Sequence, residues 1–146
     1  MSADETQEHG RTMTIPDPWM HRAGWASDAV HVADARQFVT QHLTEHELPR
    51  EVDVLRLVVS ELATNAVMHA ATPFTVSLGR LDGTLTLSVR DLSFDHPQGP
   101  ARPRSTTLRG RGLHIVDVLS SAWGVTAERD GKTVWAEFNL PERHLA

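Results

Sequence analysis

Three polar side chains recur at four-residue intervals near the middle of the chain. They are Glu61, Asn65 and His69, in a segment that contains neither glycine nor proline. If this segment is helical, all three lie along one stripe of the helix surface. A carboxylate can accept a proton or orient water, and an amide oxygen is a hard ligand suited to Mg²⁺. The stripe could therefore meet a metal–phosphate ligand, although the triplet alone is read better as i, i+4 pairing on a solvated helix face.

Three further features stand out, and two of them could contact a nucleotide. Asp91 directly follows a predicted strand, and its carboxylate could accept a hydrogen bond from an amine such as that of adenine; alone, it reads better as a turn-starting Asp. Gly110-Arg111-Gly112 stands at a predicted helix start, where free backbone N–H groups suit phosphate or simply form a tight turn. Thr133 lies on a predicted strand, where a β-branched residue is common without any further role.

Two familiar kinds of site do not match. A zinc protease needs two histidines around a glutamate, whereas only His69 accompanies Glu61. The glycines at 110 and 112 lack the additional Gly and Lys of the Rossmann and P-loop patterns. The chain also has no cysteine, which excludes disulfides and thiolate chemistry.

The elements that would position these residues follow from the periodicity. Apolar residues at helical spacing predict helices over 28–47, with Ser27 as N-cap, and over 50–70; a third helix begins at Gly110, with Leu113, Val116 and Leu119 facing inward. Alternation around Asp82-Gly83 predicts one hairpin, and a second is expected over 124–140 around Asp130-Gly131.

This order of elements predicts an α/β fold, a two-layer sandwich with a mixed or antiparallel sheet and the helices packed on one face. Residues 1–16 are expected to form a mobile tail, and residues 17–146 a single domain. The stretch 92–109 is long, aperiodic and interrupted by prolines, which is typical of a lid.

The charge and hydropathy of the chain limit its partners. Fourteen basic and nineteen acidic residues give a net charge of −5, which disfavours broad nucleic-acid binding. No apolar run is long enough to cross a membrane, and the N-terminus lacks the pattern of a signal peptide. We therefore expect a cytoplasmic protein with no membrane partner and no direct nucleic-acid partner.

Taken together and in order, the motifs resemble those of the GHKL superfamily of ATPases, which have the Bergerat fold. The resemblance covers roughly Arg36 to Leu140 and rests on SELATNAVMH at 60–69, DLS at 91–93, GRGLHIV at 110–116 and GKTVW at 131–135. The chain is most similar to the anti-sigma-factor serine/threonine kinase branch and to the stand-alone ATP-binding regulators of actinobacteria. Ser93 and Asp95 stand where many members carry glycine, and this form resembles the actinobacterial subgroup.

The resemblance implies a role for each matching position. Glu61 would be the general base, Asn65 the Mg²⁺ ligand, and Asp91 the acceptor of the adenine amine. The remaining positions implied to bind the ATP cofactor are His69, Ser93, Arg109, Gly110, Arg111, Gly112, Leu113 and Thr133, with Thr133 supporting adenine through water.

The leading functional hypothesis is an ATP- and Mg²⁺-dependent regulator that phosphorylates a serine or threonine of an antagonist protein and sequesters a sigma factor. The alternative is a module that binds nucleotide or protein partners without phosphate transfer. A sensor histidine kinase core is disfavoured because no helix with a phosphoacceptor histidine fits in the N-terminal segment. A gyrase-type or mismatch-repair-type ATPase is disfavoured because a transducer domain would need a longer chain. The oligomeric state is left open, a homodimer included.

Overall fold

An open five-stranded sheet, with strand order β1-β2-β3-β5-β4, organises the chain. The computed structural model describes residues 17–93 and 110–141; the expected tail at 1–16 and all but the first two residues of the expected lid lie outside these ranges. The elements are β1 (Trp19–Trp25), α2 (Val30–Glu45), a 3₁₀ turn η1 (Pro49–Glu51), α3 (Val52–Asn65), a π-helical turn η2 (Ala66–Ala70), β2 (Phe74–Leu81), β3 (Thr84–Asp91), α4 (Gly110–Leu119), β4 (Ala122–Glu128) and β5 (Gly131–Asn139).

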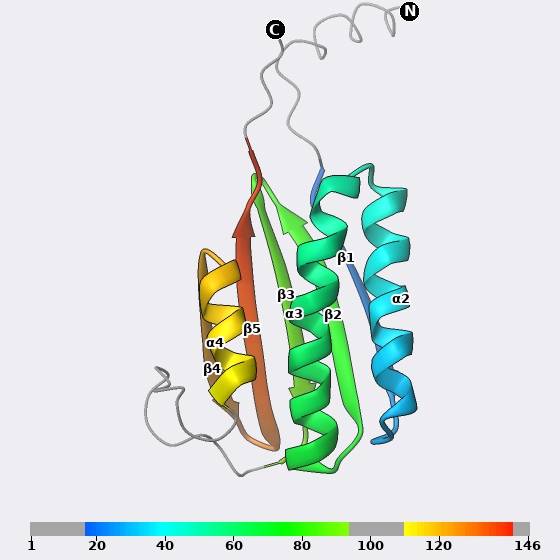
Figure 1. The fold of residues 1–146 in the computed structure, drawn as a ribbon, viewed down its shortest axis with the longest axis vertical. Coiled ribbons are helices and arrows are strands. Elements are labelled where there is room, and N and C mark those ends of the chain that lie inside the picture. Colours follow the sequence, from blue (N-terminus) through cyan, green and yellow to red (C-terminus); the bar gives the residue numbers. More distant parts are fainter. Residues whose placement is uncertain (1–16, 94–109, 142–146) are drawn as a thin grey trace, which may run out of the picture.

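The three helices α2, α3 and α4 lie side by side on one face of the sheet (Figure 1). Every pair of neighbouring strands is antiparallel. The expected two-layer α/β sandwich is therefore confirmed, and of the two sheet types anticipated the antiparallel one is found. Strand β1, which pairs with β2 at one edge, was not expected from the sequence.

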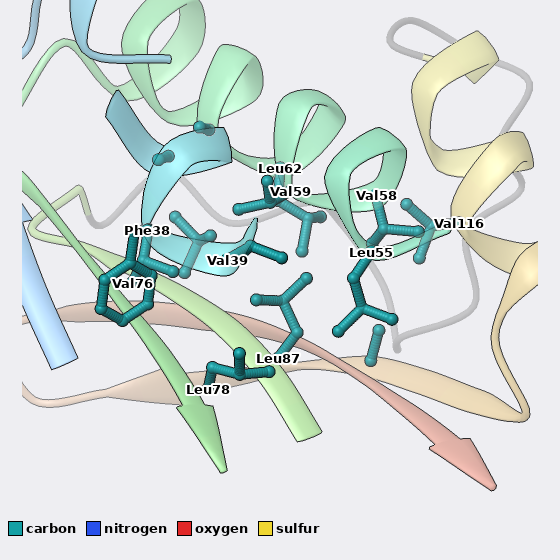
Figure 2. Packing of buried hydrophobic residues seen from close by; sticks show 14 of the residues in the cluster. Phe38, Val39, Leu55, Val58, Val59, Leu62, Val76, Leu78, Leu87 and Val116 are labelled. Carbon is teal, nitrogen blue, oxygen red and sulfur yellow. The ribbon is translucent and has the colours of Figure 1, made fainter. Parts of the chain in front are cut away.

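The core forms where α3 packs over the central strands (Figure 2). The alternating residues of β2 and β3 that were expected on one side are all buried: Val76, Leu78, Leu85, Leu87 and Val89. From the helix layer, Leu55, Val58 and Leu62 of α3 meet them, together with Val39 of α2 and Val116 of α4. Full burial of each such side chain contributes roughly 1.5–3 kcal/mol. These residues form a buried seam between the helix layer and the sheet, which holds the two layers together.

The start of α2 differs in detail from the expectation. The N–H of Val30 donates to Oδ1 of Asp28 at 3.0 Å, so Asp28 rather than Ser27 satisfies the first backbone donor. The helix ends at Glu45, and Glu47 takes a positive φ of 57° before Pro49. Among the described residues, no helix combines the length and the apolar character needed to span a bilayer.

Candidate functional site

Several chain segments end or begin at the same end of the sheet. The end of β3, the start of β5, the end of α3 with η2 and the start of α4 all lie there (Figure 1). The strand register places Asp91 of β3 between Phe74 of β2 and Lys132 of β5. The described residues that the sequence singled out on these elements are thus gathered at one end of the sheet.

Asp91 is buried, with 3% of its surface exposed, and its carboxylate is ion-paired to Lys132. The Lys132 ammonium Nζ lies 2.8 Å from Oδ2 and 3.2 Å from Oδ1 of Asp91. The backbone N–H of Ser93 donates to Oδ1 at 2.8 Å. A polar side chain can be buried at this position because it is paired and hydrogen-bonded.

Sequence reasoning missed Lys132, although the alternation of β5 carries the signal. Ala136 and Phe138 of this strand are buried in the core, and Lys132 shares their parity. Because side chains alternate along a strand, Lys132 must point to the same face as these residues and Asp91.

Thr133 does not lie beside Asp91. It is on the opposite, helix-free face of the sheet, where its hydroxyl donates to Oε2 of Glu128 at 3.1 Å. Arg90 is on that face too, with its Nε 2.8 Å from Oε1 of Glu128. The hydrogen bond from Arg90 to Glu128 raises the pKa of the guanidinium above its ordinary value. The implied support of adenine by Thr133 does not fit this placement, and Lys132 takes the inward position instead.

The backbone around Asp91 is tightly fitted. Gly131 has a φ of 156°, and a Cβ on it would overlap the carbonyl oxygen of Asp91. The N–H of Leu92 donates to the Thr72 hydroxyl at 2.9 Å, which ties the end of β3 to the segment that follows η2. Glycine at 131 therefore permits the close approach of β5 to the end of β3.

Glu61 and Asn65 lie on the flank of α3 that faces α4. The opposite flank is fixed by two bonds to α2, from Arg36 to the Ser60 hydroxyl at 3.1 Å and from Arg56 to the Thr40 hydroxyl at 2.9 Å. At about 3.6 residues per turn, Glu61 and Asn65 point away from that flank. Figure 1 shows α4 on the side of α3 opposite α2. Both side chains are half-buried, and within the described residues neither makes a hydrogen bond or an ion pair.

His69 lies on η2, where the helix widens and the N–H of Ala71 donates to the carbonyl of Ala66. The side chain of His69 is exposed. Such π-helical turns occur often at functional sites.

Helix α4 begins at Gly110 as expected, and its Leu113 is half-buried. Arg109 lies outside the described residues.

The polar groups at this end of the sheet have the hydrogen-bonding character needed to bind a nucleotide base. Asp91 supplies an inward-facing acceptor, and Lys132 supplies a buried donor beside it. In the described part of the chain, no group of three His, Asp or Glu side chains could hold a metal ion. An Mg²⁺ at Asn65 would then take its other ligands from phosphates and water, as this ion commonly does.

Comparison with known proteins identifies the family. Residues 25–138 match the model of the histidine kinase-like ATPase domain. The fold is similar to the crystal structure of the RsbU and RsbW domains of Rv1364c from Mycobacterium tuberculosis, with a TM-score of 0.63 and 18% sequence identity over 90% of this chain. The match spans 35% of that longer chain. No curated protein sequence matches. Because the family model covers well over half of the sequence, the chain belongs to the histidine kinase-like ATPase domain family.

Proposed function

We propose that this domain binds ATP with Mg²⁺ and acts as an anti-sigma-type regulator that phosphorylates a serine or threonine of an antagonist protein. The observation that carries the proposal is the convergence at one end of the sheet of the Glu61–Asn65 flank of α3, the start of α4 and the buried Asp91. A nucleotide bound there would have its base near β3 and its phosphates near the two helices. The RsbW name of the structural neighbour agrees with this class of regulator.

Each residue has a distinct task in this proposal. Asp91 accepts a hydrogen bond from the base amine, and the Asn65 amide oxygen ligates Mg²⁺. Bound ATP would supply the phosphoryl group. Glu61 accepts the proton of the incoming serine or threonine hydroxyl, which makes that oxygen a better nucleophile. The unpartnered state of Glu61 among the described residues leaves its carboxylate available for this task.

The test separates binding from chemistry. A general base typically contributes about 10²–10⁴-fold to rate, so Glu61→Gln should bind ATP nearly as wild type does and transfer phosphate far more slowly. The acceptor is first captured from the source cell with ATP and Mg²⁺, and labelled γ-phosphate is then followed onto it. Equal labelling by wild type and Glu61→Gln would refute the role of Glu61. Thr64→Ala, an exposed change on the same helix, is the control.

Capture of partners also tests the regulatory half of the proposal. A sigma factor among the proteins retained would support sequestration, and the mass of the purified protein in solution decides between monomer and homodimer. Retention of an antagonist protein alone would leave the kinase proposal standing and would refute sequestration.

A second candidate function is a module that binds partners or nucleotide without transferring phosphate. It is favoured by one observation, the contact of Lys132 with both carboxylate oxygens of Asp91, which uses part of the acceptor capacity of that residue. If the wild type binds ATP but labels no captured protein, this second candidate is the correct one.

A further inference from the structure

The ion pair between Lys132 and Asp91 has unused hydrogen-bonding capacity. An ammonium has three N–H donors, and the only acceptor that Lys132 contacts among the described residues is the Asp91 carboxylate. Within residues 17–93 and 110–141, Oδ2 of Asp91 accepts only the bond from Lys132, whereas Oδ1 also accepts the Ser93 N–H. A donor and an acceptor therefore remain free next to each other.

Both groups are inside the protein, where unused polar groups are costly. Lys132 is 9% exposed and Asp91 is 3% exposed. A buried donor or acceptor without a partner destabilises the protein, and more so when it is charged. A ligand that satisfied both groups at once would therefore gain from each of them.

Displacement of Lys132 by a ligand is unfavourable. Removing one partner of a buried ion pair is strongly unfavourable, because the remaining charge loses its compensation. The two residues are direct register partners on neighbouring strands, which holds their side chains together. The ligand must then add to the pair and not replace Lys132.

We propose that Lys132 is a second base-reading residue of the nucleotide site: it donates to the ring nitrogen N1 of adenine, while Asp91 accepts from the neighbouring amine. The edge of adenine presents an acceptor, N1, directly beside a donor, the amine, which matches the free donor and acceptor of the pair. The inference rests on the proposed ATP binding and adds a residue that sets specificity.

The test uses an ATP analogue that lacks only N1. In 1-deaza-ATP a C–H replaces the ring nitrogen, so the amine remains and the acceptor is lost. Calorimetry with Mg²⁺ should show the wild type binding ATP about tenfold to a hundredfold more tightly than 1-deaza-ATP, the range for a hydrogen bond to a charged group. Lys132→Met should bind ATP more weakly and should not distinguish the two nucleotides.

A matched control is available one residue from Asp91. Arg90→Gln removes one positive charge as well, but on the helix-free face, and should keep the discrimination. Equal affinity of the wild type for the two nucleotides would overturn the role of Lys132 and leave ATP binding intact. Tighter ATP binding by Lys132→Met would also overturn it, because Lys132 would then be a competitor for Asp91. If the wild type binds neither nucleotide, both the inference and the proposed function fail. Should Lys132→Met not fold, the wild-type comparison decides alone.

Discussion

At the scale of single residues, Gly131 shows how the backbone limits which residue type can occupy one position beside the site. Its φ of 156° is rarely adopted by residues with a side chain, and a Cβ there would overlap the Asp91 carbonyl. Lys132 follows Gly131 directly at the start of β5. If a side chain were introduced at Gly131, the backbone shift that removed the overlap would also move the Lys132 ammonium, which pairs with Asp91.

The first prediction compares two glycines. Gly131→Ala should destabilise the protein by about 1–3 kcal/mol, because it adds backbone strain and a steric clash. Gly83→Ala is the matched control: a Cβ at Gly83 meets nothing within 4 Å, so the change should stay within about 0.5 kcal/mol. Urea unfolding of the two variants gives both values. A Gly131→Ala variant as stable as the Gly83→Ala variant would contradict the prediction.

The sequence predicts Asp91 but not its partner, for a physical reason. Asp91 follows a clean alternation of buried residues, so its place at the end of β3 can be read directly. Lys132 could be assigned to the inner face only by following the alternation of Ala136 and Phe138 back along β5, and the apolar Trp135 on the other face makes that alternation less distinct. A shift by one residue exchanges the two faces of a strand, so the face of each residue at the start of β5 depends on that register.

At the scale of elements, β1 is joined to α2 through histidines. His21 of β1 stacks on His42 of α2 at 3.8 Å between ring centroids, and its Nε2 lies 2.9 Å from Nε2 of His46. One of these two nitrogens must donate and the other accept, so at least one imidazole is neutral. Trp19 stacks on His46 at 3.8 Å, and Glu45 hydrogen-bonds His42 at 3.0 Å.

The second prediction concerns the pH dependence of this cluster. Burial lowers the pKa of His21, and the neighbouring His42 and His46 lower it further, while Glu45 acts in the opposite direction. Since the pKa in the folded state lies below the unfolded value of about 6.5, the unfolded chain binds more protons in that window. The contribution of neutral His21 is thus fully present above pH 6.5 and is lost as the pH falls towards the lowered pKa.

Unfolding free energies measured at pH 8 and pH 5.5 check this expectation. The decrease in the free energy of unfolding from pH 8 to pH 5.5 should be smaller in His21→Phe, which keeps an aromatic ring but cannot gain a proton. His114→Gln, a change of an exposed histidine on α4, should retain the full decline. An equal decline in wild type and His21→Phe would assign the pH dependence to other groups.

The residues of β1 explain why this strand was not predicted from the sequence. In β1 the inner face carries Trp19, His21, Ala23 and Trp25, and the outer face carries Met20, Arg22 and Gly24. Methionine outside and histidine inside weaken the alternation on which strand prediction relies. The hairpin of β2 and β3 was predicted because its buried positions are mainly Val and Leu and its turn contains Asp-Gly. The second hairpin has a more mixed inner face, and its turn at Asp130-Gly131 was the clearer signal.

At the scale of the whole molecule, the core and the candidate site occupy different parts of one sandwich. The buried seam runs along α3 and the central strands (Figure 2), whereas the polar site lies at the end where these elements terminate. Asn65 is the last residue of α3, and its half-buried side chain makes no hydrogen bond in the described part of the chain. Changes there should therefore affect ligand binding without much effect on folding.

The last prediction uses this separation. A ligand that binds only the folded state stabilises it by about 2.7 kcal/mol at a concentration of one hundred times its Kd, which corresponds to roughly 5–10 °C in Tm for a chain of this size. ATP with Mg²⁺ should therefore raise the Tm of the wild type by that amount. Asn65→Ala should melt within a few degrees of the wild type without ligand, because Asn65 packs no part of the core.

At the same ATP and Mg²⁺ concentrations, however, Asn65→Ala should lose most of the increase in Tm, because the metal no longer has its amide ligand. Thr64→Ala, the exposed neighbour on α3, should keep the full increase. Repeating the melts with EDTA in place of Mg²⁺ should bring the wild type down to the level of Asn65→Ala. If Asn65→Ala keeps the wild-type increase with Mg²⁺, then Asn65 does not hold the metal; if it unfolds far below the wild type without ligand, then the site and the core are not separate.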